Sequence, residues 1–203
     1  MISELNHQLF HLIIGLTGNS LIDSLMVFIA GYSTYLIPPL LVLMWFKGGR
    51  ERYISVFAFL SVFVGQLYIE FIQAVYHQPR PYTIYETLVT QVTDNSFPSQ
   101  HAATMFTFAF TLLAERRKRL GYFFVLLAML NGFARMYIGV HFPLDILAGA
   151  LMFIPAYLTM TKLRGYSDRV TDFTTKIEVF IISKTGLENY YGKLQNDLNR
   201  IFP

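Results

Sequence analysis

Cysteine is absent from the 203 residues, which excludes disulfide bonds and thiolate chemistry. Charged residues are scarce as well: they make up 14% of the chain, whereas ordinary soluble domains contain about 25%. Hydrophobic residues reach 54%, and the mean hydropathy is +0.43. This length and composition indicate a single domain embedded in a membrane.

Basic residues are absent from the first 46 positions, and the distribution of the others predicts a topology. Of the 16 Lys and Arg residues, 14 fall in blocks at 47–52, at 116–119 and from 162 onward. Apolar runs of membrane length separate these blocks, which argues against a nucleic-acid-binding surface. Because basic loops stay on the cytoplasmic side, we place the three blocks and the C-terminus in the cytoplasm.

The apolar runs predict an all-α integral membrane bundle with about five transmembrane helices. The expected spans are residues 25–46, 53–76, 99–115, 120–138 and 142–161. We expect a kink in the first span at Pro38 and Pro39, because proline removes a backbone donor. Residues 1–17 should form an amphipathic helix at the interface, completing a domain over 1–162, and residues 163–203 a cytoplasmic amphipathic tail.

A polar stripe interrupts the second span. Gln66, Glu70, Gln73 and His77 are spaced i, i+4, i+7 and i+11, which places all four on one helical face. Such a face in a membrane turns toward protein or water. The stripe is either a structural seam between helices or the wall of a functional site, and the sequence leaves both interpretations open.

Two arginines lie outside the basic blocks, and both belong to the opposite, outer side of the expected topology. All five histidines lie at or near the same side. Arginine keeps its charge and donates bidentately to phosphoryl oxygens, so Arg80 and Arg135 are candidate anion ligands. Three segments should converge there: Arg80-Pro81, residues 96–101 and residues 135–145.

Two of these segments carry helix-start signals and ionisable side chains. Proline precedes Ser99 and follows His141 by two positions, which predicts two helix N-termini, each suited to anion binding. Asp145 is four residues after His141 and can lie beneath it on one helical face, fixing its tautomer. His101 has no carboxylate at i+4 and is available to protonate a leaving oxygen.

Arg80-Pro81, SFPSQH at 96–101 and ARMYIGVHFPLD at 134–145 resemble the three-part signature of the type 2 phosphatidic acid phosphatase (PAP2) superfamily. That signature is Lys-x6-Arg-Pro, Pro-Ser-Gly-His and Ser-Arg-x5-His-x3-Asp. The resemblance implies a phosphatase that needs no metal or other cofactor and forms a phosphohistidine. It implies that His141 is the nucleophile, Asp145 its orienting carboxylate and His101 the acid. The implied phosphate ligands are Arg80, Ser99, Arg135 and the backbone N–H of Gln100.

Three positions depart from the superfamily pattern. Gln73 stands where the signature has lysine, Gln100 where it has glycine, and Ala134 where it has serine. The first departure removes one positive charge from the phosphate-binding set, although Gln73 can still donate a neutral hydrogen bond. Gln73, Glu70 and Ser96 are therefore candidate accessory residues.

The N-terminal stretch ELNHQLFHLIIG and the Asp94–Phe97 approach to the second motif are similar to bacterial undecaprenyl-diphosphate phosphatases of the bacitracin-resistance type. This resemblance implies removal of the terminal phosphate of undecaprenyl diphosphate, with the active site on the outer face of the bacterial cytoplasmic membrane. The reaction would recycle the lipid carrier of cell-wall synthesis. Two alternatives stay open: a broader phosphatase of phosphatidic acid or phosphatidylglycerol phosphate, and a lipid or ion transporter using Glu70, Arg80 and Arg135.

Overall fold

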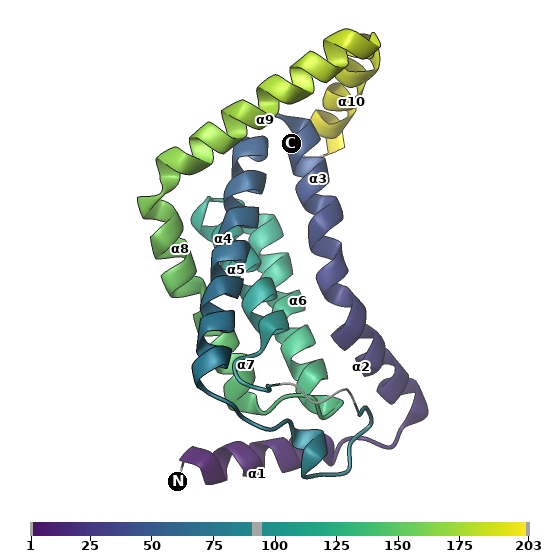
Figure 1. Ribbon diagram of the computed structural model, residues 1–203. Helices are drawn as coiled ribbons and strands as arrows, with labels where there is room; N and C mark the ends of the chain where they lie inside the picture. The colour runs from purple at the N-terminus through teal and green to yellow at the C-terminus, as the bar shows by residue number, and fades with distance from the viewer. Residues whose placement is uncertain (1, 91–94, 202–203) are drawn as a thin grey trace.

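The computed structural model describes residues 2–90 and 95–201, so Asp94 lies outside the described residues. Within these ranges the chain is helical and contains no strand, which confirms the predicted all-α class (Figure 1). The elements in order are α1 (Ile2–Ile14), α2 (Ser20–Tyr32), the 3-10 helix η1 (Ser33–Leu36), α3 (Ile37–Lys47), α4 (Gly49–Val75), the 3-10 helix η2 (Pro81–Thr83), α5 (Gln100–Ala114), α6 (Lys118–Tyr137), α7 (Pro143–Leu151), α8 (Phe153–Lys162), α9 (Arg164–Thr185) and α10 (Glu188–Ile201).

Four helical stretches of the described chain are long and apolar enough to cross a membrane: Ser20–Lys47, Gly49–Val75, Lys118–Tyr137 and Pro143–Lys162. The expected span at 99–115 corresponds to α5, which has 15 residues. At 1.5 Å per residue it extends for only ~22 Å. It packs against α4, α6, α7 and α8, so it forms the centre of the bundle. α5 alone is therefore too short to cross a hydrocarbon core of about 30 Å.

The first span is interrupted, as the prolines predict. α2 ends at Tyr32, η1 follows, and α3 then begins with Pro38 and Pro39 in its first turn. The Ile29 carbonyl at the end of α2 still accepts the Ser33 N–H, and α6 supplies a further donor from the side. Asn131 Nδ2 donates to Ile29 O at 3.2 Å and to Ser33 Oγ at 2.8 Å. The predicted kink is therefore a break of one 3-10 turn, held by a buried amide.

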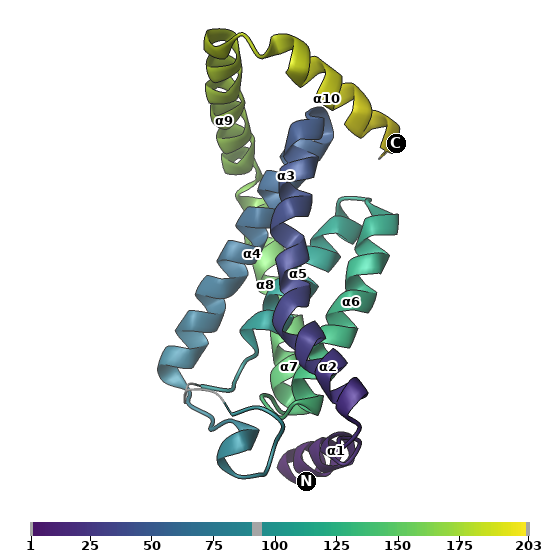
Figure 2. The ribbon, with the colours of Figure 1, turned by 90° about the vertical axis from the view of Figure 1, so that its right-hand side faces the viewer.

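α1 lies across one end of the bundle, beside residues 76–90 and the start of α7 (Figures 1 and 2). Phe10 is fully buried and packs on the rings of Tyr85 and Phe142, with ring centroids 5.5 and 5.1 Å away. Asn6 Oδ1 accepts the Leu144 N–H at 3.0 Å, which satisfies one of the free amides at the α7 N-terminus. α1 thus covers the end of the bundle that carries the candidate site.

The three basic blocks meet at the other end. Arg117 pairs with Glu51, Arg164 Nη2 lies 2.7 Å from Glu115 Oε1, and Arg50 donates to the Glu115 carbonyl at 3.1 Å. These contacts join the α3–α4 turn, the α5–α6 turn and the start of α9. Such clustering agrees with the arrangement expected from the basic residues, in which all three blocks share one side of the membrane.

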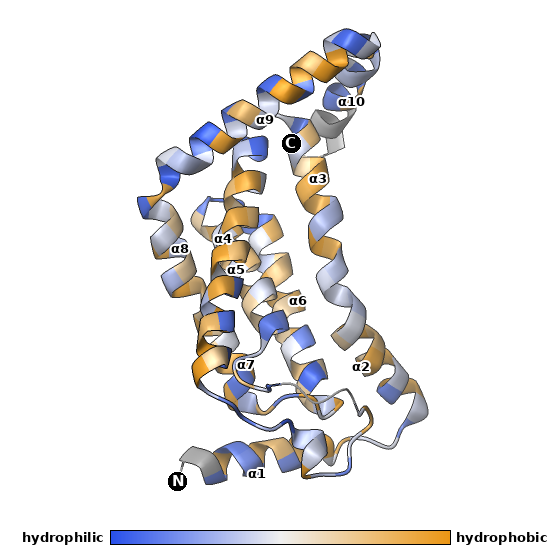
Figure 3. Cartoon of the chain, in the orientation of Figure 1, coloured by the Kyte–Doolittle hydropathy of each residue, from blue (hydrophilic) through white to orange (hydrophobic). Residues whose placement is uncertain are grey.

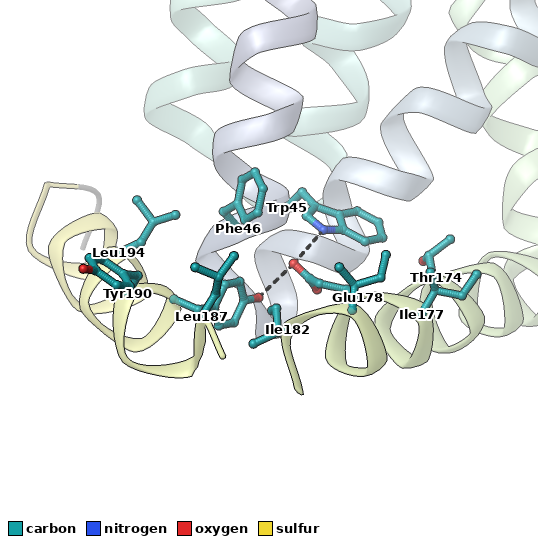
Figure 4. Close-up of a pocket in the computed structure, with 11 residues that line it drawn as sticks. Trp45, Phe46, Thr174, Ile177, Glu178, Ile182, Leu187, Tyr190 and Leu194 are labelled. Atoms are coloured by element: carbon teal, nitrogen blue, oxygen red, sulfur yellow. Dashed lines mark hydrogen bonds between the residues drawn. The ribbon is translucent and has the colours of Figure 1, made fainter. Parts of the chain in front are cut away.

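Beyond this end, α9 leaves the bundle obliquely and α10 folds back toward α3 (Figures 1 and 2). Apolar and polar residues alternate along α9 (Figure 3). An apolar pocket of about 530 Å³ lies between α3, α9 and α10 (Figure 4). Beside it, Glu178 pairs with Arg52 at 2.5 Å and accepts from Trp45 Nε1 at 3.2 Å and Tyr191 Oη at 3.0 Å. The tail is therefore a helical hairpin that packs on α3 and α4, with the half-buried Glu178 carboxylate at the contact.

Candidate active site

The first turns of α5 and α7 pack side by side and carry the candidate site. Ser99 is the N-cap of α5, and its Oγ accepts the Ala102 N–H. The Ser99 N–H donates to the Asp145 carbonyl at 3.0 Å. A side chain at Gly149 would place its Cβ 2.5 Å from the Ser99 carbonyl oxygen, so only glycine permits this close approach. Both predicted helix starts are confirmed, since α5 begins at Gln100 and α7 at Pro143.

Asp145 is the most extensively bonded carboxylate of the site. It is fully buried. Its Oδ2 accepts from Ser96 Oγ at 2.5 Å and from the Phe142 N–H at 2.8 Å, and its Oδ1 accepts from Gln78 Nε2 at 3.0 Å. Three donors stabilise the charged form of a carboxylate away from water. Asp145 is thereby held in one orientation beside His141.

His141 lies in the connection before α7, not on the helix itself. The expectation that Asp145 lies beneath His141 on one helical face is therefore wrong. α7 begins at Pro143, and Asp145 is its third residue, so the carboxylate reaches back to the Phe142 N–H as a helix cap does. The first turn of α7, and not a shared helical face, therefore brings Asp145 Oδ2 to 3.5 Å from His141 Nδ1.

The two ring nitrogens of His141 have different surroundings. Nδ1 lies 3.4 Å from Ser96 Oγ and faces Asp145, whereas Nε2 lies 3.3 Å from Arg80 Nη1. A guanidinium can only donate, so Nε2 is the acceptor and we assign the ring proton to Nδ1. Burial lowers the pKa of His141 well below its usual value, and the charges of Arg135 and Arg80 lower it further. His141 is thus a neutral imidazole with an available lone pair.

The two candidate phosphate-binding arginines approach from different elements. Arg80, in the loop before η2, is buried and donates to Val140 O at 3.0 Å and Asn95 O at 3.2 Å. Arg135, on α6, is also buried and donates to Ala30 O at 3.1 Å. Both charges act on the His141 imidazole. The structure thus places two guanidinium groups around one histidine.

His101 is the second residue of α5 and is half-buried on the same side as His141. The N–H groups of Gln100 and His101 have no intrahelical acceptor at these positions, so α5 presents free donors toward the site. We also expected the N-terminus of α7 to offer free N–H groups to an anion. That expectation needs correction, because the Leu144 N–H donates to Asn6 Oδ1.

The polar stripe of α4 forms a seam with the start of α5. Gln66 Nε2 donates to Gln100 O at 3.1 Å, and Gln73 Nε2 donates to Pro98 O at 3.1 Å. Gln100 Nε2 donates to Glu70 Oε1 at 2.9 Å and to Gln73 Oε1 at 3.3 Å. The structural interpretation of these three residues is therefore supported, and the seam positions the turn that carries His101.

His77 does not belong to this seam. The expectation of a fourth stripe residue is wrong because α4 ends at Val75, so His77 lies exposed in the following loop.

Sequence reasoning missed two loop residues that support the site. Gln78 donates to Asp145, as described above. Asn95 Oδ1 accepts the N–H groups of Gln78 at 2.9 Å and Phe97 at 3.1 Å, and its Nδ2 donates to the Gln73 and Tyr76 carbonyls. An Asn that accepts from the residue two positions later is a common turn signal, which Asn95 and Phe97 display. No local sequence signal predicts the contacts of Asn95 with Gln73, Tyr76 and Gln78.

In residues 2–90 and 95–201, no three His, Cys, Asp or Glu side chains are grouped as metal ligands. The chemistry available at this end of the bundle is that of a neutral imidazole, a second histidine, two guanidinium groups and free helix amides. These groups suit an anion with several oxygens and a reacting centre close to His141 Nε2.

The profile of the PAP2 superfamily matches residues 53–167, which is more than half of the chain. The chain belongs to the PAP2 superfamily. The matched PAP2 region contains Arg80, His101, His141 and Asp145, together with most of α4 and all of α5 through α8.

Relatives of this PAP2 protein extend the match toward both ends. It is 29% identical over 184 residues to undecaprenyl-diphosphatase BcrC of Bacillus subtilis, covering 89% of this chain and 95% of the relative. It is 33% identical over 159 residues to the putative undecaprenyl-diphosphatase YbjG of Escherichia coli, covering 74% and 78%. The crystal structure of Aquifex aeolicus LpxE is similar with a TM-score of 0.67 at 30% identity, covering 78% of this chain and 95% of that one.

Proposed function

We propose that this membrane protein hydrolyses undecaprenyl diphosphate to undecaprenyl phosphate and inorganic phosphate. The observation that carries the proposal is the His141 ring, held at Nδ1 by Asp145 and Ser96 while Nε2 faces Arg80. The resemblance to relatives named undecaprenyl-diphosphatase over most of their length supports the choice of substrate.

In the first step, the Nε2 lone pair of His141 attacks the terminal phosphorus. The bond from that phosphorus to the bridging oxygen breaks, and His101 gives its proton to the bridging oxygen of the departing undecaprenyl phosphate. The products are a phosphohistidine and a neutral His101. Arg80 and Arg135 stabilise the charge on the transferred phosphoryl group. When substrate binds, its phosphoryl oxygens replace His141 Nε2 as the acceptor of the Arg80 Nη1 hydrogen bond.

In the second step, water attacks the phosphohistidine while His101 removes a proton from it. The nitrogen–phosphorus bond breaks, His141 Nε2 regains its lone pair, and inorganic phosphate leaves. His101 is then protonated again, so each turnover consumes one water and restores both histidines. Asp145 keeps the proton on Nδ1 throughout, which leaves Nε2 available for the next cycle.

The proposed active site faces the outer side of the bacterial cytoplasmic membrane. The basic blocks lie at the opposite end of the bundle, joined by the Arg117–Glu51 and Arg164–Glu115 pairs, and the positive-inside rule assigns that end to the cytoplasm. The tail formed by α9 and α10 would then be cytoplasmic. Cysteine substitution at exposed His77 and Tyr190, followed by labelling with a membrane-impermeant thiol reagent on intact cells, tests this. Labelling of position 190 but not of position 77 would overturn the orientation.

The decisive assay compares substrates. Purified protein in vesicles is given undecaprenyl diphosphate, phosphatidylglycerol phosphate and phosphatidic acid, and phosphate release is measured. We expect the highest kcat/KM for undecaprenyl diphosphate, and loss of turnover in His141→Ala. His77→Ala is the matched control, because His77 is exposed and lies outside the site. Preference for phosphatidylglycerol phosphate would favour the broader lipid phosphatase, and lipid flux without phosphate release would favour a transporter.

A further inference from the structure

A small cavity lined by residues of polar type adjoins His101. Its volume is about 140 Å³, and it is lined by Thr34, Gln66, Gln100, His101 and Thr104. These residues come from three separate elements, since Thr34 belongs to η1, Gln66 to α4 and the others to α5. The cavity therefore exists only where the break in the first span approaches the beginning of α5.

Two hydroxyl groups in this cavity have protons available for a ligand. Thr104 Oγ1 accepts from Gln66 Nε2 at 2.8 Å, which leaves its own proton free to be donated. Thr34 Oγ1 is buried and has no hydrogen-bond partner among residues 2–90 and 95–201. Buried polar atoms are nearly always paired, so an unpaired hydroxyl in a cavity points to a missing partner.

The chemistry of the proposed reaction determines what lies next to His101. The acid protonates the oxygen that bridges the two phosphorus atoms, so the second phosphorus is one bond from that oxygen. We infer that this cavity binds the phosphate that stays on the lipid, with Thr34 and Thr104 as its hydrogen-bond donors. The inference rests on the proposed function, and it makes this cavity the feature that distinguishes diphosphate from monophosphate lipids.

The charges around the cavity are compatible with an anion. Arg135 and Arg80 interact electrostatically with His101, which lines the cavity. The Glu70 carboxylate is exposed, does not line the cavity and accepts from Gln100 Nε2. The amide donors of Gln66 and Gln100 are already engaged, so the two hydroxyls supply the free donors.

The position of η1 also provides a route for the lipid chain. Thr34 precedes Tyr35 and Leu36, which are 69% and 48% exposed within a stretch long enough to span the membrane. A lipid whose retained phosphate lies at Thr34 can therefore extend its prenyl chain into the bilayer at the break. A monophosphate lipid such as phosphatidic acid has no second phosphate to place in the cavity.

Isosteric substitutions test the inference. Thr34→Val and Thr104→Val remove one hydroxyl each, and Thr107→Val is the matched control, because Thr107 is buried one turn further along α5 and lies outside the cavity. The measurement is kcat/KM for undecaprenyl diphosphate and for phosphatidic acid. We expect each cavity variant to lose about tenfold with the diphosphate, the size of one hydrogen bond to a charged group, and less than about twofold with phosphatidic acid.

Inhibition of phosphatidic acid turnover by the product undecaprenyl phosphate is a second measurement, because the cavity variants should retain that turnover. Its inhibition constant should rise about tenfold in Thr34→Val and Thr104→Val and stay unchanged in Thr107→Val. Equal losses on both substrates, or unchanged selectivity and inhibition, would overturn the cavity assignment while leaving the proposed function in place. A wild-type protein that releases phosphate from phosphatidic acid but not from undecaprenyl diphosphate would instead overturn the proposed function, and the inference with it.

Discussion

Asp145→Asn isolates the charge of the carboxylate beside His141. When neutral His141 attacks phosphorus, its ring becomes positively charged, and this charge appears 3.5 Å from Asp145 Oδ2. Asparagine keeps the shape of the side chain. Its oxygen must face the Phe142 N–H, because a backbone donor cannot be reversed, and its amide then faces Gln78, whose own amide can rotate to accept. The hydrogen bonds therefore survive and the charge is lost.

The magnitude follows from the distance. Two unit charges 3.5 Å apart interact by about 5 kcal/mol at an effective dielectric constant of roughly 20, which is an upper estimate. We therefore expect kcat to fall by up to about 10³-fold in Asp145→Asn. The melting temperature should change little. Asp145→Ala, in contrast, leaves Ser96 Oγ and the Phe142 N–H without an acceptor, and we expect it to lose stability as well.

The assay is single-turnover phosphate release with measured melting temperatures for both variants. A kcat for Asp145→Asn within about threefold of wild type would refute the electrostatic role of Asp145, because the charge would then contribute less than ~1 kcal/mol. Equal loss of stability in the two variants would refute the hydrogen-bond argument instead. In that case the Asn side chain would not occupy the place of the carboxylate.

Three further predictions concern pH, metals and the tail. Because the pKa of His141 is lowered in the folded protein, the unfolded chain binds more protons below pH ~6.5, so stability should fall as the pH drops below that value. In His141→Gln the melting temperature should depend less on pH over this range, and an unchanged pH dependence would contradict the assignment. Phosphate release should persist in EDTA, since the two proposed steps use histidines and arginines, and strict dependence on added Mg²⁺ would argue against them. Glu178→Gln should destabilise the protein by about 3 kcal/mol, because it leaves the buried Arg52 charge unpaired. Fluorescence of Trp45, the single tryptophan, should report the loosened hairpin in thermal melts, with Asp172→Asn on the exposed side of α9 as control.

Much of the fold could be predicted because its signals are local. Apolar runs of membrane length predicted the helices, and Ser99 and Pro143 marked the starts of α5 and α7. Pro38 and Pro39 marked the break in the first span. Each of these signals depends on residues within one or two turns, where backbone sterics and hydrogen bonding decide the outcome.

The arrangement around His141 could be predicted only in part. The sequence indicated that His141, Asp145 and Arg80 belong together, but it suggested a helical face where the structure has a connection and a helix cap. Gln78 was missed because its contact with Asp145 depends on the path of residues 76–90 and 95–99. Predicting that path requires the long-range hydrogen bonds of Asn95, which no periodicity reveals.

By itself, the sequence determined that this chain is a helical membrane protein of the PAP2 type, because hydrophobicity, basic blocks and motif spacing act over short distances. Only the tertiary structure decided which donors hold the Asp145 carboxylate, since Ser96 and Gln78 lie 49 and 67 positions from Asp145. The cavity beside His101 was decided in the same way. This cavity combines Thr34 with residues of α4 and α5. The Thr34 hydroxyl reaches the cavity only because separate helices pack together at this point.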